Sequence, residues 1–364
     1  MKKEDIASGR HNEPVLIAAE PLKAFCSQIL QKIGLPESDA DLTADNLVFA
    51  DLRGTDTHGV SRLGVYVQLI EGKVVNTRPH PTIIKDNGAT LLIDGDNALG
   101  QISGGFAMKS AIERAKKFGL SWVGVRNGGH LGALAYYAMM ALPHDMIGIC
   151  TTNTPPLLAP WGGKAPGIGN NPFAIAVPTG TDIPLVLDMA LSVVARGNLF
   201  LAAKEGKKIP QGWAIDKNGA PTQDPNEALK GSVLPIGAYK GAGIAIMIDV
   251  LCGVLMGAAF GQDTGSIVPP DLSKPLGLGH VMAAIAINSF ISMDDFKIRI
   301  GRYIEQIKQN PLAEGFDEVV VPNEKEFQTE MNRRKKGIPL SPTSVDELFR
   351  LAERYRVPCP FLNR

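Results

Sequence analysis

The chain has 364 residues, of which 45% are hydrophobic and 20% charged, values typical of a globular protein with one large or two interlocked domains. Its 37 basic and 37 acidic side chains leave a formal net charge of zero, so no basic excess points to a nucleic-acid partner. Four scattered cysteines without CxxC spacing argue against a disulfide framework or a zinc site, and the polar N-terminus without an apolar signal core indicates a cytoplasmic protein.

The first part of the chain is predicted to be helical. Apolar residues recur at helical spacing from Leu22 to Ile33, and Gly34 follows as a stop. A second helix is expected over 39–52 and a third over 61–72. The stretch 76–81 is rich in turn-forming residues and is predicted to be a linker.

The middle of the chain alternates between strand and helix patterns. Helices are expected over 106–118 and 133–141. Strands are predicted at 90–94, 121–125, 147–151, 173–177, 185–188 and 280–287. Strands that alternate with helices indicate an α/β domain.

One apolar stretch, residues 241–260, is long enough to span a bilayer. Asp249 lies near its centre, where a charge costs about 3 kcal/mol in lipid, and no aromatic belt flanks the stretch. We therefore predict a buried core helix and no membrane span. Asp249 should then be paired or capped inside the fold.

The end of the chain returns to helical patterns. Residues 296–309 are amphipathic, and Ser344-Val-Asp-Glu347 has the spacing of a capping box before a last helix. The expected fold class is α/β. A helical subdomain from both chain ends (1–80 plus 296–364) should carry an inserted α/β domain (81–295).

No phosphate-binding signature is intact in the sequence. GxxxxGK[ST] is absent, no predicted strand leads into GxGxxG, and the glycines of Gly237-Ala-Tyr-Lys-Gly-Ala-Gly243 have the wrong spacing. The residues alone therefore do not indicate a Rossmann domain. Lys240 precedes the apolar helix, where its charge opposes the helix dipole, so it either meets a cofactor phosphate or carboxamide or lies on the surface.

The first candidate site motif is Gly54-Thr-Asp-Thr-His-Gly-Val-Ser-Arg62. His58 and Arg62 are four residues apart, so on a helical turn they share one face, and Thr55 or Thr57 would cap that turn. A guanidinium binds a carboxylate through two parallel hydrogen bonds, while an imidazole serves the adjacent carbonyl. The alternative is a loop histidine beside a surface arginine.

The second candidate motif is Asn127-Gly-Gly-His-Leu-Gly132, directly after a predicted strand. Glycines let the backbone approach a ligand closely, and a loop position exposes the imidazole of His130. The alternative is a turn with a capping histidine. The other histidines have no such neighbours, and the six histidines lack acidic partners at ligand spacing, so no metal site is expected; these others are His11, His80, His144 and His280.

Together these segments resemble the type-2 malate/L-lactate dehydrogenase family, which includes ureidoglycolate dehydrogenase and diketogulonate reductase. The resemblance covers nearly the whole chain. Each motif alone is unspecific, and their order and spacing carry the match. The motifs are Ala50–Arg62, Gly129–Ala133, Ala159–Gly163, Gly169–Pro172, Leu187–Ala190, Gln211–Lys217, Gly237–Gly241 and Asp249–Leu255.

The resemblance implies NAD, or NADP, bound on a non-Rossmann α/β domain, and a homodimer with the active site near the subunit interface. It implies a small 2-hydroxy or 2-oxo acid as substrate: malate or oxaloacetate first, then lactate-like acids, then ureidoglycolate. A non-catalytic binding protein on the same fold and a cofactor-free lyase are the alternatives. No nucleic acid or membrane is expected as a partner.

The resemblance also implies roles for individual residues. The base and acid histidines fall on His130 and His58, the arginine for the substrate carboxylate falls on Arg62, and Thr57 lies where many members have serine. Cofactor contacts would involve Thr154, Asp188, Met189, Ala190, Lys240, Asn323 and Glu324.

The chain departs from the family pattern at two positions that bear on cofactor contacts. Pro322-Asn-Glu324 stands where many members have Pro-Gly-Glu, and Asn198 stands where many have lysine. The implied chemistry is unaffected: hydride leaves C2 of the hydroxy acid while a histidine removes the hydroxyl proton. An imidazole pKa near neutrality would suit both directions of this reaction.

Overall fold

The computed structural model describes residues 13–360, so His11 and the rest of 1–12 and 361–364 lie outside the described part of the chain. Within that part, no helix is both long and apolar enough to cross a membrane.

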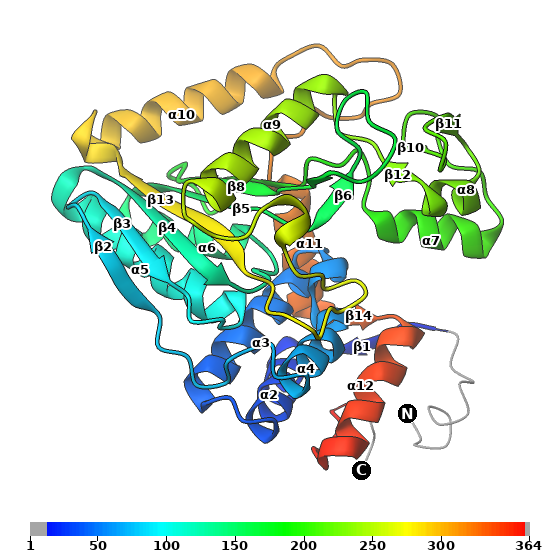
Figure 1. The fold of residues 1–364 in the computed structure, drawn as a ribbon. Helices are drawn as coiled ribbons and strands as arrows, with labels where there is room; N and C mark the ends of the chain where they lie inside the picture. Colours follow the sequence, from blue (N-terminus) through cyan, green and yellow to red (C-terminus); the bar gives the residue numbers. More distant parts are fainter. Residues whose placement is uncertain (1–12, 361–364) are drawn as a thin grey trace.

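A mixed seven-stranded sheet forms the centre of the molecule (Figure 1). Its strand order is β2-β3-β4-β13-β5-β8-β9; β3 and β4 are parallel, and every other neighbouring pair is antiparallel. Doubly wound dinucleotide-binding sheets are mostly parallel, so this sheet has a different topology. The strands are β2 (Thr82–Asp86), β3 (Thr90–Asp94), β4 (Leu120–Gly128), β5 (Met146–Thr152), β8 (Phe173–Val177), β9 (Leu185–Met189) and β13 (Leu278–Ala286).

Helices cover both faces of this sheet. Alternate residues of a strand point to opposite faces, so one strand contributes to two cores. Met282 and Ala284 of β13 join one core with α5 (Gly100–Phe118) and α6 (Ala135–Met139). Val281 joins the other core, with α9 (Tyr239–Asp249) and the π-helical turn η4 that follows it.

A smaller five-stranded sheet, β11-β10-β12-β6-β7, extends the α9 side of the molecule. Its edge strand β11 pairs antiparallel with β10, and β12 pairs parallel with β6. The elements of this part are β6 (Pro156–Leu158), β7 (Ile168–Gly169), α7 (Arg196–Glu205), β10 (Ala214–Ile215), β11 (Pro221–Thr222), α8 (Pro225–Lys230), β12 (Ser232–Val233) and η4 (Val250–Val254).

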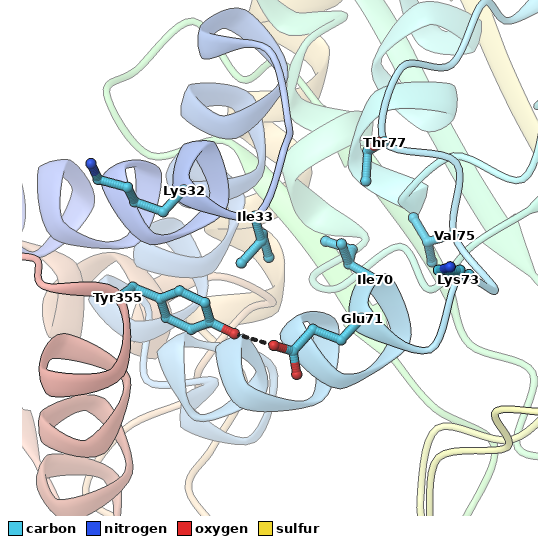
Figure 2. Close-up of a pocket in the computed structure, with 8 residues that line it drawn as sticks. All are labelled: Lys32, Ile33, Ile70, Glu71, Lys73, Val75, Thr77 and Tyr355. Carbon is cyan, nitrogen blue, oxygen red and sulfur yellow. Dashed lines mark hydrogen bonds between the residues drawn. The ribbon is translucent and has the colours of Figure 1, made fainter.

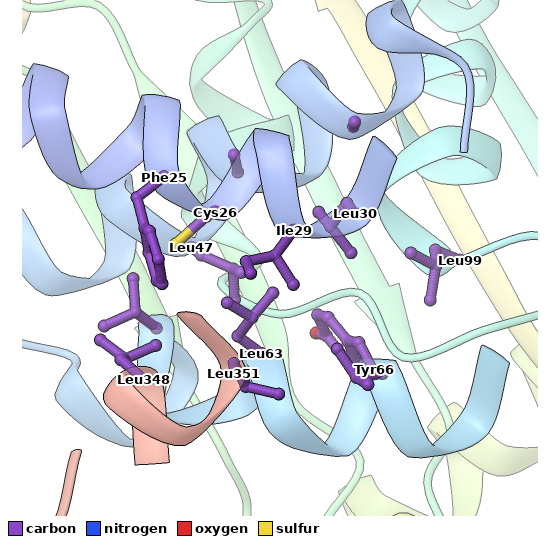
Figure 3. Close-up of a cluster of buried hydrophobic side chains, with 14 of the residues drawn as sticks. Phe25, Cys26, Ile29, Leu30, Leu47, Leu63, Tyr66, Leu99, Leu348 and Leu351 are labelled. Carbon is purple, nitrogen blue, oxygen red and sulfur yellow. The ribbon is translucent and has the colours of Figure 1, made fainter. Parts of the chain in front are cut away.

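Helices from both ends of the described chain share a third core, shown in Figure 3. There Leu22 and Ile29 of the first helix meet Leu63 of the third and Leu348 of the last. A strand near each end pairs with the other, because β1 and β14 are antiparallel neighbours. The elements are β1 (Val15–Ile17), α2 (Ala19–Lys32), α3 (Glu37–Leu52), η1 (Asp56–His58), η2 (Val60–Arg62), α4 (Leu63–Glu71), α11 (Glu324–Lys336), β14 (Ile338–Leu340) and α12 (Pro342–Tyr355).

The stretch 241–260 is not a buried core helix, so that expectation is wrong. The α-helix ends at Asp249, and its Met247 side chain is 57% exposed. The sequence is apolar on all sides of the helix, whereas the sheet covers only one side. The prediction for Asp249 itself is confirmed: its carboxylate accepts hydrogen bonds from the amide of Asn153 at 2.8 Å and from the backbone N–H of Gly261 at 3.3 Å.

The capping box predicted at Ser344–Glu347 is also wrong. The last helix begins at Pro342, and Ser341 caps it by accepting a hydrogen bond from the N–H of Ser344 at 3.2 Å. Proline suits the first helical position because its missing N–H has no partner there in any case. The carboxylate of Glu347 instead lies against Gly64, where a Cβ would come within 1.8 Å of it.

The helix expected over 296–309 is α10 (Met293–Lys308), capped by Ser292. It follows β13 at the opposite end of the molecule from α2, α3 and α12 (Figure 1), and none of its side chains is buried. The division of the chain at residues 80 and 296 stays a prediction, and α10 itself lies beside the α/β part.

Candidate active site

Thr57, His58 and Arg62 lie on two consecutive 3₁₀ turns, η1 and η2. The expected single helical face does not form, because Gly59 between the turns is extended (φ −84°, ψ −151°). Among residues 13–360, no side chain caps either turn. Instead, Thr57 Oγ1 bonds His58 Nδ1 at 3.0 Å, and Arg62 Nε donates to the Thr57 carbonyl oxygen at 2.6 Å. Thr57 therefore links the histidine to the arginine.

Asp51, a residue that the sequence patterns do not single out, holds these turns in place. It is buried in α3, and its carboxylate accepts a hydrogen bond from the N–H of Val60 at 2.8 Å. A Cβ at Gly59 would lie 1.8 Å from this carboxylate, so only glycine fits there. Burial raises the pKa of Asp51 to about 7, against the lowering effect of the Val60 N–H.

His130 follows β4 in a turn whose glycines are required by packing within the protein. A Cβ at Gly128 would lie 2.1 Å from Nε2 of His280, a buried residue of β13. A Cβ at Gly129 would lie 2.6 Å from the carbonyl oxygen of Ala98 and 2.8 Å from the nitrogen of Gly100, at the start of α5. The sequence analysis expected these glycines to let a ligand approach, but they are needed for close packing inside the protein. The turn is held between β13 and the start of α5.

The structure brings the two predicted histidines face to face. The rings of His58 and His130 are stacked, with centroids 5.6 Å apart and planes 18° from parallel. His130 Nδ1 lies 2.9 Å from the hydroxyl oxygen of Tyr66, and the Gln101 amide nitrogen lies 3.0 Å from the same oxygen. One nitrogen of His130 is thus tied to the interior of the protein.

Both imidazoles are half-buried, with protein around most of each ring. Burial and, to a smaller extent, the positive charge of Arg62 lower the pKa of His58 to about 4. Burial also lowers the pKa of His130 well below its usual value, followed by the effects of His58, Arg62 and His280. Both rings are therefore neutral at neutral pH and able to accept a proton, although the sequence suggested a pKa near neutrality.

A cavity of about 210 Å³ adjoins these turns, with Thr55 and Ala133 in its wall. Asp188, at the end of β9, and Asn323 also line it. The Asp188 carboxylate accepts a hydrogen bond from the N–H of Ala135 at 2.8 Å, and its side chain keeps solvent-accessible surface. The surrounding protein nevertheless raises the pKa of Asp188 to about 6, opposed by that N–H and by the charge of Arg53.

Thr154 lies where several strand ends meet. Its hydroxyl donates to the Asn170 side chain at 2.9 Å, and the backbone oxygen of Asn170 accepts from Leu191 at 2.8 Å. The amide of Asn171 donates to the Ala245 carbonyl oxygen at 2.7 Å. These bonds bring Thr154 together with α9 and with the segment that follows Met189 and Ala190.

The two remaining predicted contacts lie differently. Lys240 is exposed on the first turn of α9. The Glu324 carboxylate is engaged by Lys308 at 2.6 Å and by the N–H of Val321 at 3.0 Å, and it does not line the cavity next to Asp188.

A larger cavity, of about 430 Å³, lies elsewhere, between α2, α4 and α12 (Figure 2). Its Glu71 carboxylate accepts hydrogen bonds from Tyr355 and Arg354, both at 2.6 Å. None of the predicted site residues lines it, whereas Asp188 and Asn323 line the smaller cavity. His58 and His130 line neither cavity, so the candidate site consists of the histidine pair and, next to its turns, the smaller cavity. The lining residues are Lys32, Ile33, Ile70, Glu71, Lys73, Val75, Thr77 and Tyr355.

Residues 17–349 match the family model for malate/L-lactate dehydrogenase. The chain belongs to this family. The malate dehydrogenase of Pyrococcus abyssi is 40% identical over 351 residues, covering 94% of this chain and 96% of that protein. The malate/(S)-sulfolactate dehydrogenase of Methanothermus fervidus is 38% identical over 343 residues, covering 94% and 99%. The solved sulfolactate dehydrogenase of Methanocaldococcus jannaschii has a TM-score of 0.89 and 36% identity, covering 94% of this chain and 98% of that one.

Membership of the malate/L-lactate dehydrogenase family confirms the predicted resemblance, the mixed α/β fold and a 2-hydroxyacid dehydrogenase as the class of enzyme. Sequence patterns missed Tyr66 and Gln101 next to His130. Tyr66 counted only as an apolar position of the third helix. The one available signal for Gln101 was a polar side chain directly after Leu99-Gly100, at the start of a largely apolar helix.

Proposed function

We propose that the chain transfers hydride between NAD(P) and C2 of a small 2-hydroxy or 2-oxo acid, with malate and oxaloacetate as the favoured pair and lactate-like acids next. The observation that carries this proposal is the stacked pair of neutral histidines linked through Thr57 to Arg62. The names of the two relatives above, which act on malate or sulfolactate, support a substrate with a second acidic group. Ureidoglycolate is the alternative substrate.

In the oxidation direction, His130 takes the substrate hydroxyl proton. Its Nδ1 is tied to Tyr66, so Nε2 is the nitrogen left for the substrate. Arg62 holds the substrate carboxylate: its Nε is committed to Thr57, and its terminal nitrogens have no hydrogen bond to the described residues. The arginine orients the substrate, and its charge stabilises the negative charge that develops on the oxygen. His58 lies stacked on the ring of His130.

The cavity next to Asp188 fits part of a dinucleotide. At about 210 Å³ it is smaller than sites that enclose whole drug-sized ligands, and suits one ribose or base. A carboxylate and an amide at its wall match sugar hydroxyls. When bound, NAD supplies the hydride acceptor; NADP is possible. The proposed contacts are Thr154, Asp188, Met189, Ala190, Lys240, Asn323 and Glu324.

A screen of 2-oxo acids with NADH and with NADPH tests this function. We expect oxaloacetate to be reduced fastest, ahead of pyruvate. The screen also includes sulfopyruvate, the sulfonate analogue of oxaloacetate. Fluorescence titration with each reduced cofactor is the control. Cofactor binding without turnover of any acid would support a non-catalytic binding protein, and absence of cofactor binding would support a lyase.

The proposed function includes a homodimer, as the family resemblance implies. The outer side of α9, of η4 and of the residue after it carries apolar side chains that are more than half exposed in the described part of the chain, among them Met247, Val254 (54% exposed) and Leu255 (62% exposed). Contiguous exposed apolar surface marks interaction sites, and stable interfaces bury about 800 Å² on each partner. A second copy of the chain is the proposed occupant.

Two lysines on this side of the molecule should separate the dimer. We expect the double variant Met247→Lys/Val254→Lys to be monomeric, because burying two charges against an apolar partner surface is unfavourable. Light scattering after size exclusion gives the mass. The matched control is Leu16→Lys, which adds a lysine at an exposed apolar residue of β1 and should leave the dimer intact. A dimeric double variant would place the interface elsewhere.

A further inference from the structure

A chain of buried hydrogen bonds runs from His130 into the helical core. Nδ1 of His130 meets the hydroxyl of Tyr66 at 2.9 Å, and that oxygen meets the Gln101 amide nitrogen at 3.0 Å. Tyr66 and Gln101 are fully buried, and Figure 3 places Tyr66 inside the core beside Leu63 and Leu99. No solvent reaches these hydrogen-bonded side chains from that side, so their donors and acceptors must pair with one another.

Tyr66 has one hydroxyl proton and can donate it either to His130 or to Gln101. Which residue receives it decides which nitrogen of His130 carries a proton. If the Gln101 amide donates to Tyr66, the Tyr66 proton goes to His130 Nδ1. A neutral His130 then carries its own proton on Nε2, the nitrogen that the bond to Tyr66 leaves for the substrate. In that tautomer the ring donates a hydrogen bond to the substrate and has no lone pair for the hydroxyl proton.

The oxygen of the Gln101 amide offers the opposite direction. This Oε1 atom is buried and has no hydrogen-bond partner among the described residues, an arrangement that is rare in proteins. Turning the amide end over end would place Oε1 at the Tyr66 hydroxyl. The NH2 group would then take the place of the unpartnered oxygen, and its bond to Asn46, which is long at 3.5 Å, would be lost. Tyr66 then donates to Oε1 and accepts from Nδ1–H of His130, which leaves the Nε2 lone pair for the substrate.

We infer that Tyr66 and Gln101 are positioning residues that set the tautomer of His130 and stabilise its protonated form during turnover. The inference rests on the proposed function. In oxidation, the substrate O–H bond breaks, the Nε2–H bond of His130 forms, and the hydride of C2 passes to the nicotinamide. Nδ1–H remains bonded to Tyr66 throughout, so the chain accepts the positive charge of the ring without a further proton transfer.

Other charged or titratable groups face His130 from neighbouring elements. His58 on η1, Arg62 on η2 and His280 on β13 all lower its pKa, as does burial. Tyr66 on α4 and, behind it, Gln101 on α5 are the groups that can oppose them by accepting from Nδ1–H. Substitutions in the chain should therefore move the pKa of His130 in a direction set by the acceptor they leave.

The test compares three variants by the pH dependence of kcat/KM for hydroxy-acid oxidation. In this profile kcat/KM rises with pH as His130 becomes neutral, and this part of the profile is its rising limb. Tyr66→Phe and Gln101→Met remove the acceptor, so the rising limb should move to lower pH. Activity should fall about 10- to 100-fold, as it does when hydrogen-bond partners of metal-binding histidines are removed. Gln101→Glu supplies a stronger acceptor, so the limb should move to higher pH. Opposite displacements at one position are not expected of a structural role.

Tyr137→Phe is the matched control. Tyr137 is an equally buried tyrosine whose hydroxyl donates to the Leu131 carbonyl oxygen at 2.7 Å, so its loss should leave the limb in place. The imidazole ¹⁵N resonances of His130, assigned by their loss in His130→Ala, give the tautomer without turnover; the proton should sit on Nδ1 in the parent and become shared with Nε2 in Tyr66→Phe.

The outcomes separate the inference from the proposed function. If folded Tyr66→Phe and Gln101→Met keep the parent limb and the parent tautomer while His130→Ala is inactive, the inference is overturned and the proposed function stands. If His130→Ala is active, the proposed role of His130 is itself wrong. If Gln101→Glu fails to fold, the other two variants and the ¹⁵N spectrum still decide.

Discussion

Replacement of His130 by alanine is expected to lower kcat by about 10²- to 10⁴-fold, the usual contribution of a general base. The imidazole lies in a clamped turn with Nδ1 bonded to Tyr66, and its ring is stacked on that of His58. Cofactor affinity should stay nearly unchanged, because the proposed cofactor contacts lie on other segments. Steady-state kinetics and an NADH fluorescence titration measure the two effects.

His144→Ala is the control for this experiment, since His144 is an exposed histidine on η3 (Leu142–His144). It should keep the parent kcat. A His130→Ala enzyme that retains more than about a tenth of the parent kcat would contradict the assignment of His130 as the base. His58, the stacked partner, would then be the next candidate.

Arg62→Lys is expected to lower kcat/KM for the 2-oxo acid by about 30- to 150-fold, equivalent to about 2–3 kcal/mol for a lost charged hydrogen bond. The guanidinium offers a planar pair of donors that matches a carboxylate, whereas lysine offers a single point charge. Lysine also lacks the Nε–H that donates to Thr57, so the link between Arg62 and the His58 turn is lost as well.

NADH affinity should be unaffected in Arg62→Lys, which separates a substrate contact from a cofactor contact. Arg78→Lys makes the same exchange at an exposed arginine and should be neutral. If Arg62→Lys keeps the parent kcat/KM, Arg62 does not bind the substrate carboxylate, and that carboxylate has no assigned partner.

Elements with a clear pattern could be predicted from the sequence. The strands 90–94 and 173–177 have the predicted bounds, because short apolar runs between turn formers decide them locally. The prediction of a buried helix over 241–260 was wrong because hydrophobicity does not tell which side of a helix the sheet will cover. The capping box failed because Ser341-Pro342, a better helix start, lies just before it.

The candidate site could be predicted only where it is local in sequence. Thr57, His58 and Arg62 share one short motif, and His130 lies in another, so both were found. Tyr66 is 64 residues from His130, and Gln101 is 35 residues from Tyr66. The contacts among these three residues depend on how α4 and α5 pack, and the spacing of apolar residues in the sequence does not predict that packing. The low pKa values of the histidines have the same origin, since burial is a property of the fold.

The pairing of β1 with β14 has a consequence for synthesis of the protein on the ribosome. The first helices of the chain cannot complete their core until the last strand and α12 arrive, because Val345 and Leu348 fill the space beside Leu63. The η2 turn that carries Arg62 leads directly into α4, which packs on α12. Contacts of such long sequence separation form late. A nascent chain therefore holds the η2 turn without the support of α12 until that helix has been synthesised, although Asp51 of α3 can already bond it.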